Sequence, residues 1–248
     1  MTSVFDLHIH TNQGSPDSAL TREDLVSEGR RLGLTGVMVA EHHGWPRYDF
    51  NEFAKRQDGI VMVRALEVYT PLGHIITLGL DQHVTGYGGG IDTIRKLRKE
   101  VDRIGGFMIL AHPFRFLFDP SGIYTQNLLF ENAAAIPSTA EGAAKHPIFE
   151  LVDEVEVVNG GNIEKENRFA QEVTKVLGLS GTGGSDAHSV QGLGKGSTMF
   201  RGDIRNELDL LEALRAGEFV PVEGFHIGRP IYYGDNPNGG GSPWSASA

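Results

Sequence analysis

The stretch FDLHIHTNQGSPDS, residues 5–18, contains two histidines separated by one residue and an aspartate in a Ser-Pro-Asp-Ser turn. Alternate side chains of a β-strand point to the same face. A strand over Val4–His10 would therefore direct Asp6, His8 and His10 to one side. Two imidazoles on one face can bind a metal ion, but they can equally be two hydrogen-bonded polar side chains. The remainder of the sequence must distinguish these possibilities.

The composition is that of an ordinary globular protein, with 248 residues of which 40% are hydrophobic and 22% charged. This length fits one large α/β domain or two smaller ones. The absence of cysteine excludes disulfides, thiolate metal sites and cysteine nucleophiles. The formal net charge of −10 argues against binding of extended nucleic acid, which requires clustered lysine and arginine.

The sequence contains no run of roughly 18 apolar residues, the length that a membrane helix needs. The first residues, MTSVFDLHIH, lack the basic and then apolar pattern of a signal segment. We therefore expect a cytoplasmic protein without membrane contact. The sequence does not indicate an oligomeric state.

Short apolar runs alternate with amphipathic stretches, which is typical of repeated β-α units. Besides the first strand, we expect strands at residues 36–40, 60–68, 74–80, 105–111, 153–158 and 178–184. Helices are expected at residues 22–32, 91–104, 163–177 and 205–217. Thr21 is a predicted N-cap with Asp24 in the capping-box place, and glycines are plausible C-caps.

The chain shows no internal repeat and no convincing linker, so one domain over residues 1–235 is predicted. Residues 116–148 are less periodic and mix proline, alanine and asparagine. We interpret them as an insertion with short helices that covers the site. The glycine-rich residues 236–248 are predicted to form a flexible tail.

Side chains of the metal-ligand type gather at the ends of the predicted strands. They are Glu41 and His42 after the second strand, Glu67 in the third, His74 at the start of the next, His112 after GGFMILA, and Asp186 and His188 after GLSGTGG. In barrels and open α/β sheets, chemistry collects at the carboxyl ends of strands. Imidazole and carboxylate ligands suit zinc, manganese and iron. The pattern therefore favours a metal site.

The motifs DLHIHT, AEHH, ALEV, AHPF and GSDAH together resemble the polymerase and histidinol phosphatase (PHP) family of metal-dependent phosphoesterases. The resemblance covers most of the chain. It implies a single distorted (β/α)7-type barrel with two or three divalent ions, zinc, manganese or iron, at the carboxyl end of the strands. By their matching motifs, the implied ligands are His8, His10, Asp17, His42, Glu67, His74, His112, Asp186 and His188. Among them, Glu67 is the implied bridging carboxylate.

A few polar residues near these motifs have less certain roles. Glu41 stands where the family more often has an aspartate before the histidine. Asp6 could orient a liganding imidazole or be an ordinary strand-edge carboxylate. The remaining histidines match no motif and are interpreted as surface or core residues: His43, His83, His146 and His226.

Binding of phosphate needs cations beyond the metals, preferably a guanidinium. Arg115 follows His112 in AHPFR and should lie at the mouth of the barrel, although a surface ion pair is the alternative. Lys195, in the glycine-rich GLGKGST, is a second candidate substrate ligand.

We predict an enzyme that hydrolyses a phosphate ester, a small phosphomonoester in particular, by a metal-activated hydroxide. Asp186 or His188 could move protons in this reaction. The nearest alternative is a PHP-type nuclease acting on nucleic-acid ends. An amidohydrolase or deaminase shares the first H-x-H but commonly uses a lysine or glutamate on a middle strand. A metal-stabilised binding module without catalysis is the third alternative.

Overall fold

A computed structural model of the chain describes residues 1–83, 89–118 and 125–233. Its strands are β1 (Thr2–Ile9), β2 (Gly36–Glu41), β3 (Val61–Thr70), β4 (Gly73–Leu78), β5 (Phe107–Ala111), β6 (Glu154–Asn159), β7 (Thr182–Gly184), β8 (Gly196–Arg201), β9 (Phe219–Glu223) and β10 (Ile231–Tyr232). Its α-helices are α1 (Arg22–Leu32), α2 (Arg47–Ala54), α3 (Ile91–Arg103), α4 (Ala140–Ala143), α5 (Glu164–Leu177) and α6 (Glu207–Ala216). The predicted tail, residues 236–248, lies outside the described residues.

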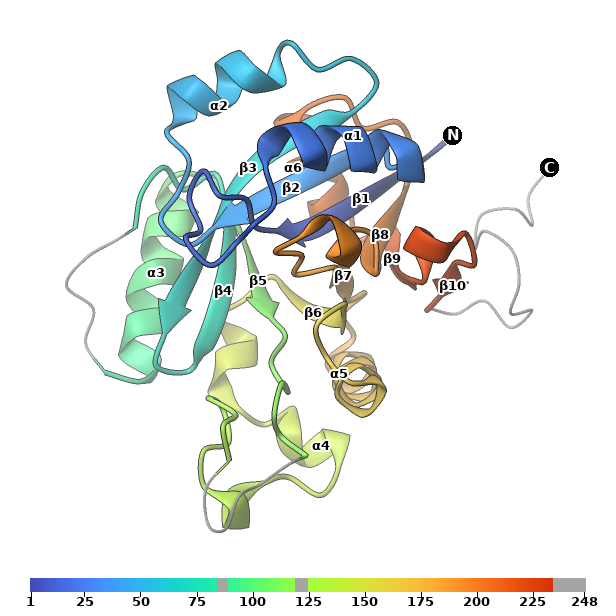
Figure 1. Ribbon diagram of the computed structural model, residues 1–248. Coiled ribbons are helices and arrows are strands. Elements are labelled where there is room, and N and C mark those ends of the chain that lie inside the picture. Colours follow the sequence, from blue (N-terminus) through green and yellow to red (C-terminus); the bar gives the residue numbers. More distant parts are fainter. Residues whose placement is uncertain (84–88, 119–124, 234–248) are drawn as a thin grey trace.

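All these strands belong to one mixed sheet in the order β10-β9-β8-β1-β2-β3-β4-β5-β6-β7. The pairs β1–β2, β2–β3, β5–β6 and β6–β7 are parallel, whereas β4 runs antiparallel to both of its neighbours. The sheet curls into a half-barrel, with helices arranged around it (Figure 1). This architecture confirms the predicted barrel-type fold.

The curl brings the segment after β7 back to the carboxyl end of β1. Ile9 and Ala187 form an isolated parallel bridge. The backbone N–H of Asp186 donates to the carbonyl of His8 at 2.7 Å, and that of His10 donates to Ala187 at 3.0 Å. Residues near the two ends of the sequence are therefore joined through the backbone, and seven strands, β1 to β7, surround the interior.

Local sequence signals explain where the helices begin and end. The Thr21 side chain accepts from the backbone N–H of Asp24 at 3.1 Å and so caps α1. The helices α1, α5 and α6 each end at a glycine in the left-handed conformation, namely Gly33, Gly178 and Gly217. These predicted caps are confirmed.

Apolar side chains pack on both sides of the sheet. Ile94 and Leu97 of α3, together with Ala170 and Val173 of α5, belong to a cluster on one side. A different cluster joins alternate residues of β2, β4 and β5 to Leu210 and Leu214 of α6. Among the described helices, none is both long enough and apolar enough to span a membrane.

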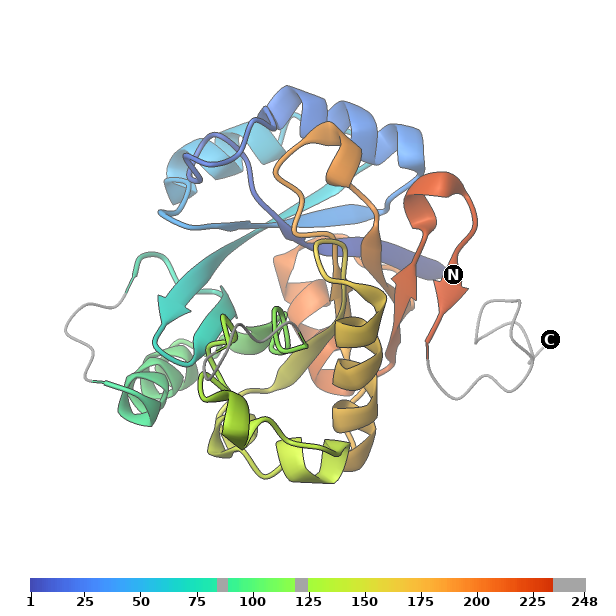
Figure 2. The same ribbon diagram turned by 60° about the horizontal axis from the view of Figure 1, so that its bottom comes forward.

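Several elements were not predicted from the sequence. They are α2 and the antiparallel strands β8, β9 and β10, which extend the sheet from the open edge of β1. Within the predicted insertion, the described residues form α4 and two short 3-10 helices, η1 (Ala133–Ala135) and η2 (Pro147–Glu150). Figure 2 shows this region beside α5.

Candidate metal centre

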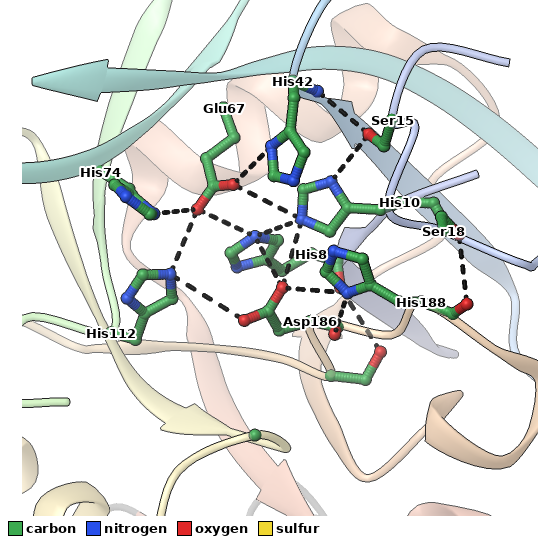
Figure 3. Close-up of polar contacts among 12 residues, drawn as sticks. His8, His10, Ser15, Ser18, His42, Glu67, His74, His112, Asp186 and His188 are labelled. Atoms are coloured by element: carbon green, nitrogen blue, oxygen red, sulfur yellow. Dashed lines mark hydrogen bonds and ion pairs between the residues drawn. The ribbon is translucent and has the colours of Figure 1, made fainter. Parts of the chain in front are cut away.

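Imidazole and carboxylate side chains from six strand ends converge at one edge of the sheet (Figure 3). Among the described residues, four groups place their ligand atoms within 4.8 Å of one another. The groups are His8, His10 and Glu67; Glu67, His74 and His112; His8, His112 and Asp186; and His10, His42 and His188. Their overlap makes one continuous cluster. It brings together eight of the nine predicted ligands.

The ninth, Asp17, lies at the rim of this cluster. Its Oδ2 atom is 3.2 Å from Nε2 of His42 and 3.4 Å from Nε2 of His188. The Asp17 side chain is 57% exposed, whereas most of the cluster is buried. Asp17 therefore contacts two histidines of the cluster from its solvent-exposed side.

Glu67 occupies the middle of the cluster, between two sets of histidines. Its Oε1 atom lies within 3.4 Å of a ring nitrogen of His8, His74 and His112. Its Oε2 atom lies within 3.5 Å of a ring nitrogen of His10 and His42. Because each oxygen faces a different set, this carboxylate lies between the two sets of histidines.

His74 reaches the cluster because β3 and β4 form an antiparallel hairpin. Tyr69 of β3 pairs with His74 of β4, and Glu67 lies two residues before Tyr69. The amino end of β4 therefore lies at the same edge as the carboxyl ends of the parallel strands. Nδ1 of His74 is 3.0 Å from Glu67.

The two histidines of β1 are oriented by buried partners. Nδ1 of His8 lies 3.1 Å from Oε1 of Glu156. Nδ1 of His10 lies 3.2 Å from the hydroxyl of Ser15, which itself donates to Glu41. Both contacts favour a proton on Nδ1 of the ring. Such partners fix the tautomer and orientation of metal-binding histidines.

The remaining nitrogens of these rings provide a test of whether the site fits a cation. Nε2 of His8 and Nε2 of His10 face each other at 3.0 Å, in full burial. A proton or a metal ion must lie between them, because two bare nitrogen lone pairs at this distance repel each other; with no metal bound, the charge of a protonated His8 fills this role. Imidazole and carboxylate donors are those of zinc, manganese and iron sites. The residues therefore fit a divalent metal ion.

The charges of the cluster also favour a cation. Burial alone would raise the pKa of Glu67, but the charge of His8 and hydrogen bonds from other histidines hold it well below its usual value. The pKa of Asp186 is likewise well below its usual value, because His8, His10 and His112 outweigh the effect of burial. Both carboxylates are therefore ionised at neutral pH. Burial lowers the pKa of His10 to about 4, which keeps this ring neutral, as a ligand must be.

Asp6 does not orient an imidazole, which corrects one of the two roles considered for it. Its buried carboxylate accepts from the backbone N–H groups of Ser185 at 2.8 Å, Gly194 at 3.0 Å and His8 at 3.3 Å. The pairing of β1 with β2 shifts between Asp6 and Ile9, so the simple alternation assumed for this strand does not hold. Asp6 instead attaches the segments around β7 and β8 to β1.

Arg115 lies beside the cluster and binds Asp186. Its Nη2 atom is 2.7 Å from Oδ2 of Asp186 and 2.6 Å from Oδ1 of Asn159, and its Nε atom is 2.9 Å from Asn162. The guanidinium is 22% exposed. Lys195, by contrast, is exposed in a neighbouring pocket and does not belong to the cluster.

Three residues around the site were missed in the sequence. Glu156 holds His8 and also accepts from the backbone N–H of His112 at 2.9 Å. The Tyr69 hydroxyl lies 3.0 Å from Nε2 of His42. His83, interpreted as a surface or core residue, contacts the backbone carbonyl of His42 through a ring nitrogen. Glu156 had a signal, since a carboxylate inside an apolar strand requires a buried partner.

The backbone is strained at the same place. In the described residues, three non-glycine residues have positive φ: His112 at 28°, Asp186 at 54° and Phe116 at 62°. The first two are cluster members, and the third follows Arg115. Such conformations are costly and concentrate at functional sites, where the surrounding structure enforces them.

Comparisons with known proteins agree with this geometry. Residues 164–219 match the family model PHP_C, described as PHP-associated. A two-domain protein from Bacteroides vulgatus, described as containing a predicted PHP-like metal-dependent phosphoesterase, shares the fold with a TM-score of 0.62 and 21% identity. The match covers 89% of this chain and 64% of that one.

Two further solved structures share the fold. The lesion-specific endonuclease PfuEndoQ from Pyrococcus furiosus has a TM-score of 0.56 and 15% identity, over 87% of this chain and 56% of its own. An amidohydrolase from Chromobacterium violaceum, with bound sulfate and no metal, has a TM-score of 0.53 and 15% identity, over 85% and 96%. This chain therefore contains a segment that matches a PHP-associated family model, and it shares its fold with a protein described as PHP-like.

Proposed function

We propose that this protein is a metal-dependent phosphoesterase that hydrolyses a small phosphomonoester. The observation that carries the proposal is the convergence of eight imidazole and carboxylate side chains, Glu67 among them, with the guanidinium of Arg115 directly beside them. A phosphate ester needs both parts, because its phosphoryl oxygens carry negative charge and its hydrolysis needs an activated water.

The cluster supplies enough ligands for two or three ions, and zinc, manganese or iron suits its donors. When bound, such ions lower the pKa of a water molecule and neutralise charge on the phosphoryl group. The residues named in the four groups would hold them, with Glu67 as the bridge. Glu156, Ser15 and Glu41 keep the rings of His8 and His10 in place.

Arg115 would bind the phosphoryl group of the substrate. Its guanidinium is partly exposed at the edge of the cluster, and in the described part of the chain its Nη1 atom makes no hydrogen bond. A guanidinium binds phosphoryl oxygens through charge-assisted hydrogen bonds. His188, which is 32% exposed and 3.4 Å from Asp17, is the cluster histidine best placed to exchange protons with solvent.

A nuclease of the same family is the second candidate, supported by the fold shared with an endonuclease. The net charge of −10 favours a small substrate over extended nucleic acid. An amidohydrolase is less well supported, because the cation that contacts the cluster is Arg115 rather than a lysine.

The test is a screen of the protein reconstituted with zinc, manganese or iron against small phosphomonoesters, short oligonucleotides and amides. We expect release of phosphate from the monoesters, and loss of this activity on chelation. Turnover of oligonucleotides but not monoesters would favour the nuclease. Absence of any phosphoester hydrolysis at full metal loading would overturn the proposal.

A further inference from the structure

A pocket of about 350 Å³ lies next to Arg115, lined by its hydrogen-bond partners Asn159 and Asn162. It is formed by the turn between β6 and α5, the start of β8, and the segment from β9 to β10. In Figure 2, α5 and the turn before it lie beside β9 and β10. None of the nine predicted metal ligands lines it.

The pocket is connected to the metal centre through two asparagines. Asn159 and Asn162 both line it, and their side-chain oxygens accept from Arg115 at 2.6 Å and 2.9 Å. Arg115 in turn contacts Asp186. The pocket and the metal centre are therefore separated by the Arg115 side chain and its two asparagine partners, which places the pocket next to the residue proposed to bind the phosphoryl group.

The unsatisfied polar groups of the pocket are mainly cations and hydrogen-bond donors. Lys195 and Arg229 are exposed in it, and neither forms an ion pair within the described residues. The buried Nδ1 atom of His226 also has no hydrogen-bond partner there. The backbone of Lys195 is held by bonds to Gly192 and Gly224, which fixes where its side chain begins.

The two carboxylates of the pocket are already occupied by partners from the same chain. Glu223 accepts from the hydroxyl of Tyr233, and Glu164 pairs with Arg168. Glu223 keeps its negative charge, because the tyrosine hydroxyl is neutral, so the lining carries two unpaired cations, Lys195 and Arg229, against one carboxylate without a cationic partner in the described residues. A ligand group that complements these cations is an anion.

We infer that this pocket binds a second anionic group of the substrate, a carboxylate or a further phosphate, held by Lys195 and Arg229. This inference rests on the proposed phosphoesterase function and specifies its substrate class. The substrate would be a phosphomonoester with a second negative charge on its leaving group.

The experiment compares 4-carboxyphenyl phosphate with 4-carbamoylphenyl phosphate, which have nearly the same shape and differ by one charge. We expect the metal-loaded protein to favour the carboxylate roughly tenfold in kcat/KM, as for one charge-assisted contact. Lys195→Ala should remove most of this preference, Lys195→Arg should retain it, and Arg229→Ala should reduce it. Lys145→Ala, at an exposed lysine outside the pocket, is the matched control and should leave the preference unchanged.

A second readout separates this inference from the proposed function. Calorimetry with the corresponding two phosphonates, which cannot be hydrolysed, measures the same preference as a ratio of Kd values. The inference about the pocket would be overturned if both esters were hydrolysed without a preference. It would also be overturned if the preference survived in the Lys195→Ala Arg229→Ala double variant. Neither result would contradict the proposed phosphoesterase function. Tight binding of the carboxylated phosphonate without hydrolysis of either ester would support the pocket and contradict the phosphoesterase.

Discussion

Nδ1 of His8 lies 3.1 Å from Oε1 of Glu156, and both side chains are almost completely buried. This contact favours a proton on Nδ1 of His8 and directs Nε2 into the cluster. Glu156 also accepts from Asn159 at 2.9 Å, and Asn159 accepts from Arg115. One carboxylate therefore connects the predicted metal ligands to the residue proposed to bind phosphate.

Glu156→Gln should weaken metal binding without unfolding the protein. Glutamine keeps the shape of the side chain but lacks the charge that orients His8 and strengthens it as a ligand. Loss of such an outer partner typically lowers metal affinity by about 10- to 100-fold. Competition with a chelator measures this affinity directly. Glu172→Gln, at an exposed residue of α5, is the control, and equal affinities of the two variants would contradict the role of Glu156.

Ser15→Ala should disturb His10 and His42 together. The Ser15 hydroxyl donates to Glu41, accepts from His10, and accepts from the backbone N–H of His42 at 3.1 Å. Its loss leaves buried polar groups without partners, which costs about 1–3 kcal/mol of unfolding free energy. Denaturant unfolding of the metal-free protein measures this cost. An unchanged midpoint and slope would show that the hydroxyl is dispensable for stability.

Arg115→Ala should lower kcat/KM on a phosphate ester by roughly 30- to 1,000-fold, equivalent to about 2–4 kcal/mol of transition-state stabilisation. Arg115→Lys should recover only part of it, because a lysine lacks the planar set of donors that reaches Asn159, Asn162 and Asp186 together. Metal content must be measured in the same samples. Arg103→Ala, at an exposed residue, serves as the control. Wild-type kinetics of Arg115→Ala at full metal loading would remove Arg115 from the site.

His146→Asn should make the protein less sensitive to acid. The Nδ1 atom of His146 accepts from the backbone N–H of Ile148 at 3.3 Å and so caps η2. Burial lowers the pKa of His146 in the folded state. The unfolded chain therefore protonates His146 at a higher pH than the folded protein does. The stability that the neutral His146 cap contributes is lost as the pH falls below about 6.5.

Asparagine also caps helices but does not titrate in this range. The difference in unfolding free energy between wild type and His146→Asn should therefore change in favour of the variant between pH 7 and pH 5. Thermal or denaturant unfolding at both pH values provides the comparison. A constant difference would contradict the assignment.

The sequence predicted much of this site because its ligand residues lie in short motifs at strand ends. His8, His112 and Asp186 could be found in this way, although they are far apart along the chain. Glu156 carried a signal as a carboxylate inside an apolar strand, but its partner His8 could not be identified, because their contact depends on how the sheet curls, which no local pattern specifies. The strands β8 to β10 were missed for a related reason, since their pairing to β1 is long-range. The role of Asp6 stayed open between two alternatives, because an irregularity in the pairing of β1 disturbs the strict alternation of side chains.

The central claim is that Glu67 bridges a cluster of at least two metal ions. Elemental analysis of the protein after reconstitution and removal of free metal tests it most directly, with Glu67→Ala and His43→Ala in parallel. The neighbouring His43 is exposed and lies outside the four ligand groups, so its loss should change nothing. We predict at least two equivalents in wild type and His43→Ala, fewer in Glu67→Ala, and a fall in Tm when wild type is chelated. One equivalent or less in reconstituted wild type would contradict the account.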